Sequence, residues 1–328
     1  MAPKQNNKWA NKHHDQNITI NADQAEIRAL IENTASIRSG TADERIADAL
    51  DDFDAQSNAE VEDWAKEDIQ LDNADGATIE EIERRIHLMC DLYPFKLTGA
   101  SLEYCPPANN SRLYEALLCI SQANNLTTGK YKYLPRHFEF LSCIVSEVYL
   151  GSDSQSYRTG WPRGIGEPKR LKVMIEKIRQ LSGDMMGEWS WKPKEGLPID
   201  PSPRDAKECG VDVVAWKKSV DKRTGQLYLL GQCACGKNWI DDDKLAELRY
   251  KNIIGDWVDS FPVEPVKAFF TPSHAKNDFM LHASRKSASI FFDRARIVLQ
   301  AASSDKIRSN DVQSVIGKII KTVQNDLA

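Results

Sequence analysis

The stretch CGVDVVAWKKSVDKRTGQLYLLGQCACGKNW, residues 209–239, carries the strongest fold signal in the chain. Its two apolar runs, VDVVAW and QLYLLGQCAC, are rich in strand-forming residues, and the turn residues KSVDKRTG separate them. This pattern predicts two antiparallel strands that are joined as a hairpin.

Each strand of this hairpin contains one polar side chain whose chemistry needs a partner. Alternation places Asp212 on one face with Val214 and Trp216, while Gln232 lies on the strand that the turn pairs with it. A carboxylate among apolar residues is either paired with a Lys or Arg at the strand end or bound to a metal ion. A neighbouring amide favours the metal, because Mg²⁺ accepts carboxylate, amide and main-chain carbonyl oxygens.

Working outward from the hairpin, residues 129–328 have a mixed helical and strand pattern. We expect helix, strand, strand, strand, helix and strand in that order, with an insertion at 162–209 between the first two strands. The predicted elements are HFEFLSCIVSEVYLG after Pro135, SYRTGW, the hairpin itself, a helix over about 241–260 and VKAFFTP. The fold class is therefore α/β (α+β), with a mixed central sheet flanked by helices and a helical C-terminus.

The preceding residues predict helices only. A polar tail covers residues 1–19, and apolar residues at helical spacing predict an all-helical N-terminal domain over 20–128. Thr78 and Glu81 form a capping-box pattern that predicts a helix start. Residues 1–92 carry 9 Lys/Arg against 21 Asp/Glu, so this part is either a solvated helical surface or an acidic arm that binds a protein partner or mimics DNA.

Together, these residues resemble the PD-(D/E)xK nuclease superfamily in its Asp…Gln-x-Lys variant, which occurs in Mrr-like restriction endonucleases and anti-phage effectors. The resemblance covers Glu139 to Pro272. It implies a restriction-endonuclease-like fold in which Asp212, Gln232, Glu139 and the Cys233 carbonyl bind Mg²⁺ or Mn²⁺. It also implies hydrolysis of DNA phosphodiesters, as the nuclease component of a restriction or anti-phage defence system.

The lysine of that family pattern is absent from its usual place. Ala234 stands two residues after Gln232, and the nearest substitute is Lys237. A bend at Gly236 would return Lys237 to the active face, where it would complete the catalytic set with Asp212, Gln232 and Glu139. The alternative is a solvated Lys237 in a catalytically inactive nucleic-acid-binding or scaffold subunit.

Residues 93–328 carry 34 Lys/Arg against 27 Asp/Glu, so they are the better candidate for DNA contact. A basic helix begins near residue 169, and tryptophans lie close to cations. The expected nucleic-acid-binding residues are Lys169, Arg170, Lys172, Arg163, Trp161 and Trp239. The alternative is a solvated helix of mixed charge, with the tryptophans in the core.

Other classes of protein fit the chain less well. No run approaches the roughly 20 apolar residues of a membrane span, and the start has no apolar signal region, so we expect no membrane association. Seven scattered cysteines are typical of a reducing compartment, which predicts a cytoplasmic protein. The cysteines lack the paired spacing of a structural zinc site, and RGIGEP lacks the phosphate-loop lysine. Oligomeric state is left open, with a homo-oligomer as one alternative.

Overall fold

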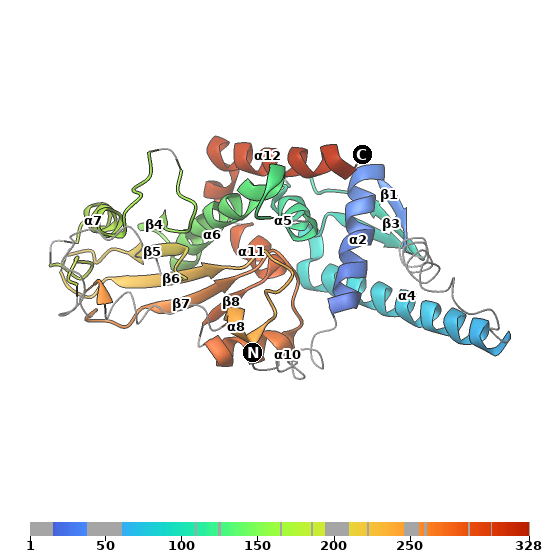
Figure 1. Ribbon diagram of the computed structural model, residues 1–328. Coiled ribbons are helices and arrows are strands. Elements are labelled where there is room, and N and C mark those ends of the chain that lie inside the picture. Colours follow the sequence, from blue (N-terminus) through green and yellow to red (C-terminus); the bar gives the residue numbers. More distant parts are fainter. Residues whose placement is uncertain are drawn as a thin grey trace.

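The computed structural model describes residues 16–37 and 61–327, apart from 109, 124–125, 165, 185, 194–209, 222, 246–255, 259–260, 288 and 303. Two sheets and the helices around them make a mixed α and β structure, as the sequence predicts (Figure 1). The predicted tail and the helical pattern DERIADALDDF lie largely or wholly outside the described residues.

The larger sheet has five strands in the order β4-β5-β6-β7-β8. Its strands β4, β5 and β6 run antiparallel, whereas β7 and β8 run parallel to β6. The strands are β4 (Ser154–Arg158), β5 (Val213–Lys217), β6 (Leu227–Cys233), β7 (Val266–Phe270) and β8 (Ile290–Phe292). The first four and the β5–β6 hairpin confirm the sequence prediction, since Val213 pairs with Gly231 and Lys217 with Leu227.

Helix α6 (Leu134–Leu150) lies against the sheet and forms where the sequence predicts it. It begins at Leu134 with a proline in its first turn, and it ends at Gly151, whose φ of 88° few other residues adopt. Its buried stripe includes Phe138, Leu141 and Val145, which pack with Ala215 and Leu229 of the sheet in the largest hydrophobic core. One face of the sheet is thus built on α6.

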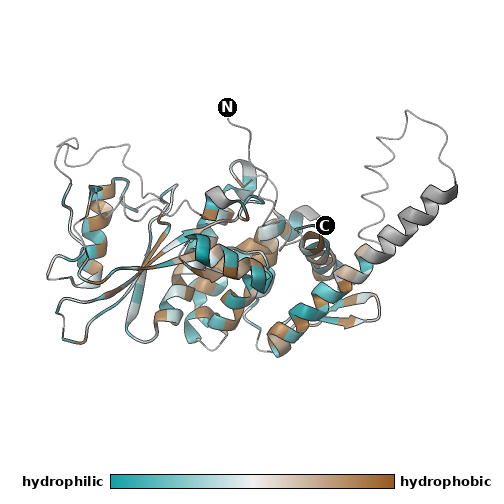
Figure 2. Cartoon of the chain, turned by 90° about the horizontal axis from the view of Figure 1, so that it is seen from below, coloured by the Kyte–Doolittle hydropathy of each residue, from teal (hydrophilic) through white to brown (hydrophobic). Residues whose placement is uncertain are grey.

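The opposite face of the sheet is covered by the insertion. Helix α7 (Leu171–Ser182) packs its buried Met174 and Ile178 in a second core with Trp216 and Leu230, and Trp189 stacks on Tyr228. The short helix α8 (Asp242–Leu245) and α10 (Asn277–Ser287) belong to a third core. Figure 2 shows hydrophobic residues along the strands and on the helices beside them.

The N-terminal part contains helices and a small sheet, so the prediction of helices alone was wrong. Strands β1 (Thr34–Ser36), β2 (Phe95–Thr98) and β3 (Ser101–Tyr104) form an antiparallel sheet in the order β1-β3-β2. FKLTGASLEY has the alternation of a hairpin, and its turn contains Gly99 at φ 61°. Its strands are only four residues long, too short to stand out beside strong helical periodicity.

Helix α4 (Val61–Met89) runs straight through the predicted helix start. Thr78 lies inside it and donates its hydroxyl hydrogen bond to the Ala74 carbonyl at 2.8 Å, as a mid-helix threonine does. Glu81 binds Arg84 and Arg85 instead of closing a capping box. The capping-box interpretation was therefore wrong, because the polar stretch DNADGAT lies inside a continuous helix, in which Asp75 and Thr78 are buried.

Three further helices complete the interior. They are α2 (Gln16–Glu32), α5 (Leu113–Gln122) and α11 (Arg294–Ala301). Helix α12 (Asn310–Leu327) packs along α5, and the 3₁₀ turns are Cys90–Leu92, Gly129–Tyr133 and Asp305–Arg308. The largest core includes residues from all four of these α-helices and from α6, so it crosses the predicted boundary at residue 128.

Candidate nuclease site

The candidate site lies at the edge of the larger sheet where β5 begins and β6 ends. Asp212 immediately precedes β5 and joins three strands there through its main chain. Its N–H donates to the Gly231 carbonyl at 2.8 Å, and its carbonyl accepts from the N–H groups of Thr159 at 2.8 Å and Gly160 at 3.2 Å. These bonds fix the backbone of Asp212 between the ends of β4 and β6.

The Asp212 side chain is half-buried and turned onto the neighbouring strand. Its Oδ2 accepts a hydrogen bond from the main-chain N–H of Cys233 at 2.8 Å. A carboxylate has about four lone-pair directions, so this bond leaves acceptor capacity for another partner. The structure thus holds Asp212 beside Cys233, which is one of the predicted metal ligands.

Glu139 reaches the same region from α6. It is 6% exposed, and Arg158 at the end of β4 donates to its Oε2 at 2.5 Å. Gly160 presses against it, because a Cβ added there would lie 2.5 Å from Glu139 Cδ. Arg158 also bonds Glu167 through its second nitrogen. The sequence did not single out Arg158, which neutralises Glu139 and fixes its position.

The carboxylates of Asp212 and Glu139 both affect the pKa of the Cys233 and Cys235 thiols. Burial raises the pKa of Cys233 and of Cys235, and the negative charges of Asp212 and Glu139 raise both pKa values further. Both thiols therefore stay protonated near neutral pH and do not supply a nucleophile. Two acidic groups from different elements share this edge of the sheet with the Cys233 main chain.

Gln232 is buried, with 2% exposed, and its Nε2 donates to the Lys244 carbonyl of α8 at 3.0 Å. Its place on the strand paired with the Asp212 strand confirms the predicted adjacency. Convergence of the two side chains on one metal ion stays a prediction. Within the described ranges, no group of three His, Cys, Asp or Glu side chains could hold a metal ion. The expected site would not form such a group, because its side-chain ligands of these types are only Asp212 and Glu139, and the other ligands are the Gln232 amide and the Cys233 carbonyl.

The chain bends after β6 near Gly236, while the return of Lys237 to the face of Asp212 stays a prediction. Strand β6 ends at Cys233, Gly236 lies in a bend, and the Trp239 N–H donates to the Gly236 carbonyl at 3.1 Å to close a turn. Lys237 is exposed at this turn. Ala234 is buried in the third core, so the usual lysine position is occupied by a packed methyl group.

Lys237 lines a pocket of about 210 Å³ between this turn and helices α2 and α5. Cys235, Gly236 and Trp239 line it from the same turn. The other lining residues are Thr19, Ile20, Asp23, Gln24, Ser121, Gln122 and Ser273. These residues were not anticipated, although Asp23 and Glu26 are acidic residues among the buried alanines Ala22, Ala25 and Ala29 of α2.

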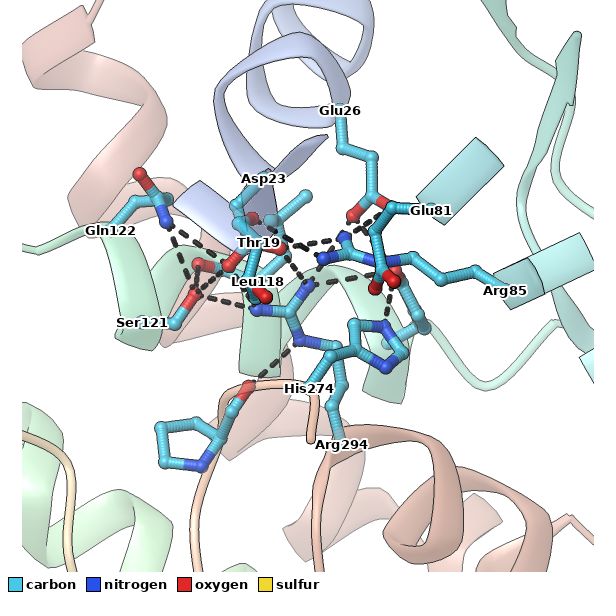
Figure 3. Close-up of polar contacts among 12 residues, drawn as sticks. Thr19, Asp23, Glu26, Glu81, Arg85, Leu118, Ser121, Gln122, His274 and Arg294 are labelled. Atoms are coloured by element: carbon cyan, nitrogen blue, oxygen red, sulfur yellow. Dashed lines mark hydrogen bonds and ion pairs between the residues drawn. The ribbon is translucent and has the colours of Figure 1, made fainter. Parts of the chain in front are cut away.

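A buried ion network supports one wall of this pocket (Figure 3). Asp23 of α2 accepts from Arg294 of α11 at 2.7 Å and from Arg85 of α4 at 2.7 Å. Glu26, one turn further along α2, accepts from Arg85 at 2.7 Å and from the Tyr114 hydroxyl at 2.7 Å. Burial opposes the charge on Asp23, but Arg294 and Arg85 outweigh it and hold the Asp23 pKa below 3.8.

The expected nucleic-acid-binding residues fall into two groups. Trp161 is 63% exposed with the Arg163 guanidinium 5.7 Å from its ring, and Lys169 and Arg170 are exposed before α7. Arg163 also donates to the Lys169 carbonyl at 2.9 Å, so it shapes this loop.

Lys172 and Trp239 are less open than the sequence suggested. Lys172 is half-buried in the first turn of α7. Trp239 is 5% exposed and packs edge-to-face on Phe279, with ring centroids 5.3 Å apart. Trp239 is therefore a core residue with one edge at the pocket, and its interpretation as a stacking platform was wrong.

No protein-family model, no curated protein and no solved structure matches the chain. Across the described ranges, no helix is both long and apolar enough to cross a lipid bilayer.

Proposed function

We propose that this protein is a Mg²⁺- or Mn²⁺-dependent DNA nuclease of the PD-(D/E)xK type. The proposal is carried by contacts at one edge of the sheet: Asp212 accepts the Cys233 N–H, and Glu139 lies against Gly160, whose N–H donates to the Asp212 carbonyl. The element order α6, β4, β5, β6, α8, β7, with β7 parallel to β6, supports it because this order accompanies the resemblance drawn from the sequence.

The donor set suits a hard divalent cation. Asp212 and Glu139 supply carboxylate oxygens, Gln232 an amide oxygen and Cys233 a main-chain carbonyl, all of which are oxygen ligands. When bound, the metal would polarise the scissile phosphate and lower the pKa of an attacking water.

The chain's own residues supply the remaining chemistry. Asp212 is fixed by bonds to β4 and β6, so its carboxylate is oriented before substrate arrives. Arg158 holds Glu139 in a neutral pair at 2.5 Å, and Glu139 would exchange this partner for the metal. Lys237, at the turn after β6, would stabilise the extra negative charge on the phosphate in the transition state. Lys169, Arg170 and Trp161 would contact the DNA backbone and an unstacked base.

A second candidate function is that of a catalytically inactive protein with the same fold. Ala234 is packed in the core where the family pattern has lysine, and Glu139 is occupied by Arg158. These two observations favour an inactive DNA-binding or scaffold subunit. Both candidates include the same further proposals. These are a cytoplasmic location, a role in restriction or anti-phage defence, a protein partner for the acidic residues 1–92 and a homo-oligomeric state.

One experiment separates the two candidates. Purified full-length protein is incubated with plasmid and single-stranded DNA in Mg²⁺, Mn²⁺ or EDTA, and Asp212→Asn serves as the inactive control. Cleavage that needs the metal and Asp212 supports the nuclease. DNA binding without cleavage under any metal supports the inactive DNA-binding subunit. Absence of both binding and cleavage contradicts the nuclease and the DNA-binding subunit and leaves the scaffold.

A further inference from the structure

The pocket beside Lys237 has the features of a built ligand site. It has a volume of about 210 Å³ and opens between helices α2 and α5 and the turn after β6. Pockets for drug-sized ligands usually have about 300–1,000 Å³. This pocket is smaller, so it can enclose no more than one nucleotide unit.

The wall formed by α2 and α5 is held by buried ion pairs and is close to neutral in charge. Asp23 is 3% exposed and forms ion pairs with Arg294 and Arg85, each at 2.7 Å. Ser121 Oγ accepts from Arg294 at 2.7 Å and donates to Asp23 at 3.1 Å. Because two guanidinium groups balance the carboxylates of Asp23 and Glu26, this wall does not repel an approaching phosphate as an unpaired Asp23 would.

Gln122 presents a fixed acceptor at this wall. Its Nε2 donates to Asp23 Oδ2 at 3.2 Å, which sets the orientation of the amide. Figure 3 shows its Oε1 turned away from the network, and among the described residues no donor bonds this oxygen. The half-buried amide is thus held with one acceptor available to a ligand.

The opposite wall supplies a cation and an apolar surface. Lys237 is exposed at the pocket and carries the positive charge, while Trp239 contributes the edge of its ring. Cys235 also lines the pocket, and it follows by two residues Cys233, whose N–H donates to the Asp212 carboxylate. The pocket therefore adjoins the candidate nuclease site.

We propose that this pocket binds the single nucleotide next to the scissile phosphate, with the base against Gln122 and the phosphate toward Lys237. The inference rests on the proposed function and assigns a base-reading role to the N-terminal helices. An acceptor oxygen favours a base with an exocyclic amino group, which adenine, cytosine and guanine have and thymine lacks.

Calorimetric titration of the full chain with dAMP, dCMP, dGMP and TMP in EDTA tests the inference without requiring cleavage. At least one amino-bearing nucleotide should bind more tightly than TMP. Gln122→Leu should weaken its binding about tenfold, the effect of one hydrogen bond of about 1.4 kcal/mol. The matched control is Gln324→Leu, which changes a half-buried glutamine of α12 outside the pocket and should leave affinity unchanged. A melting curve verifies that each variant is folded.

Lys237 provides a second readout. Lys237→Ala should weaken the binding of the nucleotide but not that of the matching deoxynucleoside, which has no phosphate. Absence of nucleotide binding at millimolar concentration, equal weakening by both glutamine variants, or inorganic phosphate binding as tightly as the nucleotide would overturn the inference. Nucleotide binding without any metal-dependent DNA cleavage would overturn the proposed nuclease function but support the nucleotide pocket. Metal-dependent cleavage without nucleotide binding would support the nuclease function but overturn the nucleotide pocket.

Discussion

Asp212 shows how one side chain can have a structural and a chemical role. Its Oδ2 accepts the Cys233 N–H, so loss of the acceptor leaves a main-chain donor without its partner at a cost of about 1–3 kcal/mol. Asparagine keeps an acceptor oxygen but loses the charge. The two substitutions therefore separate the fold from the chemistry.

We expect Asp212→Asn to reduce metal-dependent cleavage by at least about 10²-fold and to change the free energy of unfolding by less than about 1 kcal/mol. Asp212→Ala should lose both activity and some stability. Plasmid cleavage rates and urea unfolding curves measure the two effects. Asp221→Asn, at an exposed position of the hairpin turn, is the control and should alter neither. Undiminished cleavage by Asp212→Asn would exclude Asp212 as an essential ligand.

Lys237→Ala should slow cleavage about 10²- to 10³-fold at saturating DNA if the ammonium stabilises phosphoryl charge. Lys321→Ala, at an exposed position of α12, should have little effect. Ala234→Lys in the Lys237→Ala background should restore part of the rate only if residue 234 can leave the third core, so a melting curve accompanies it. Equal single-turnover rates for wild type and Lys237→Ala would refute the hypothesis that Lys237 takes the role of the family's lysine.

Glu81 links acid stability to the buried network. Burial raises its pKa, but the bonds and charges of Arg84 and Arg85 outweigh this and bring the pKa from 4.5 to about 2. Because the folded pKa lies below the unfolded value, Glu81 stabilises the fold above pH 4.5, and this contribution is lost between about pH 4.5 and 2. Its full size is on the order of 3 kcal/mol.

Glu81→Gln should therefore lower stability at pH 7 and flatten the loss of stability between pH 4.5 and 2. Urea unfolding at several pH values measures both. Glu83→Gln, at an exposed position of the same helix, should leave the slope unchanged. An unaltered slope in Glu81→Gln would mean that other carboxylates control acid unfolding.

Among the helices and strands, the distance along the chain between paired strands explains which strands the sequence could predict. The β5–β6 hairpin is local and its apolar runs are long, so its pairing followed from the residues alone. Strand β8 has three residues and exists through parallel pairing of Phe269 with Phe291, far along the chain, so no local pattern indicated it. The same holds for the site residues. Asp212 could be predicted because it belongs to the local hairpin, whereas the roles of Arg158 and Gln122 could not, because they come from contacts with residues far along the chain.

Helix α11 is held by two adjacent charged residues with different partners. Asp293 caps α11 by accepting the Arg296 N–H at 2.9 Å. Arg294 instead joins α11 to Asp23 of α2 and to Ser121 of α5. Helices far apart in sequence are thus joined by one buried side chain.

Arg294→Ala should destabilise the protein by about 3–5 kcal/mol, because it leaves the buried Asp23 carboxylate short of a partner. Arg308→Ala, which breaks an exposed pair with Asp305, should cost no more than about 1 kcal/mol. Chemical unfolding of the two variants measures the contrast. Similar losses in both would show that the buried network contributes no more than a surface pair.

For the whole molecule, the question is whether residues 129–328 form a domain of their own. Helix α12 packs along α5, and α11 packs against α4 and α5, so helices on both sides of residue 128 share the largest core (Figure 1). The Arg294 network crosses the same boundary. Neither half can retain its buried surface when the other is removed.

We therefore expect the fragment 129–328 to lose cooperative unfolding, since it would expose the faces of α11 and α12 that contact α5 and leave Arg294 without Asp23. In the full chain, six of the eight tryptophans follow residue 128, so their fluorescence reports mainly on that part, while far-UV circular dichroism reports on helices of both parts. The two probes should give coincident transitions because the halves unfold as one unit. Separate transitions, or a sharp melt of the isolated fragment, would instead establish two independent domains and would place the nucleotide pocket at an interface that can open.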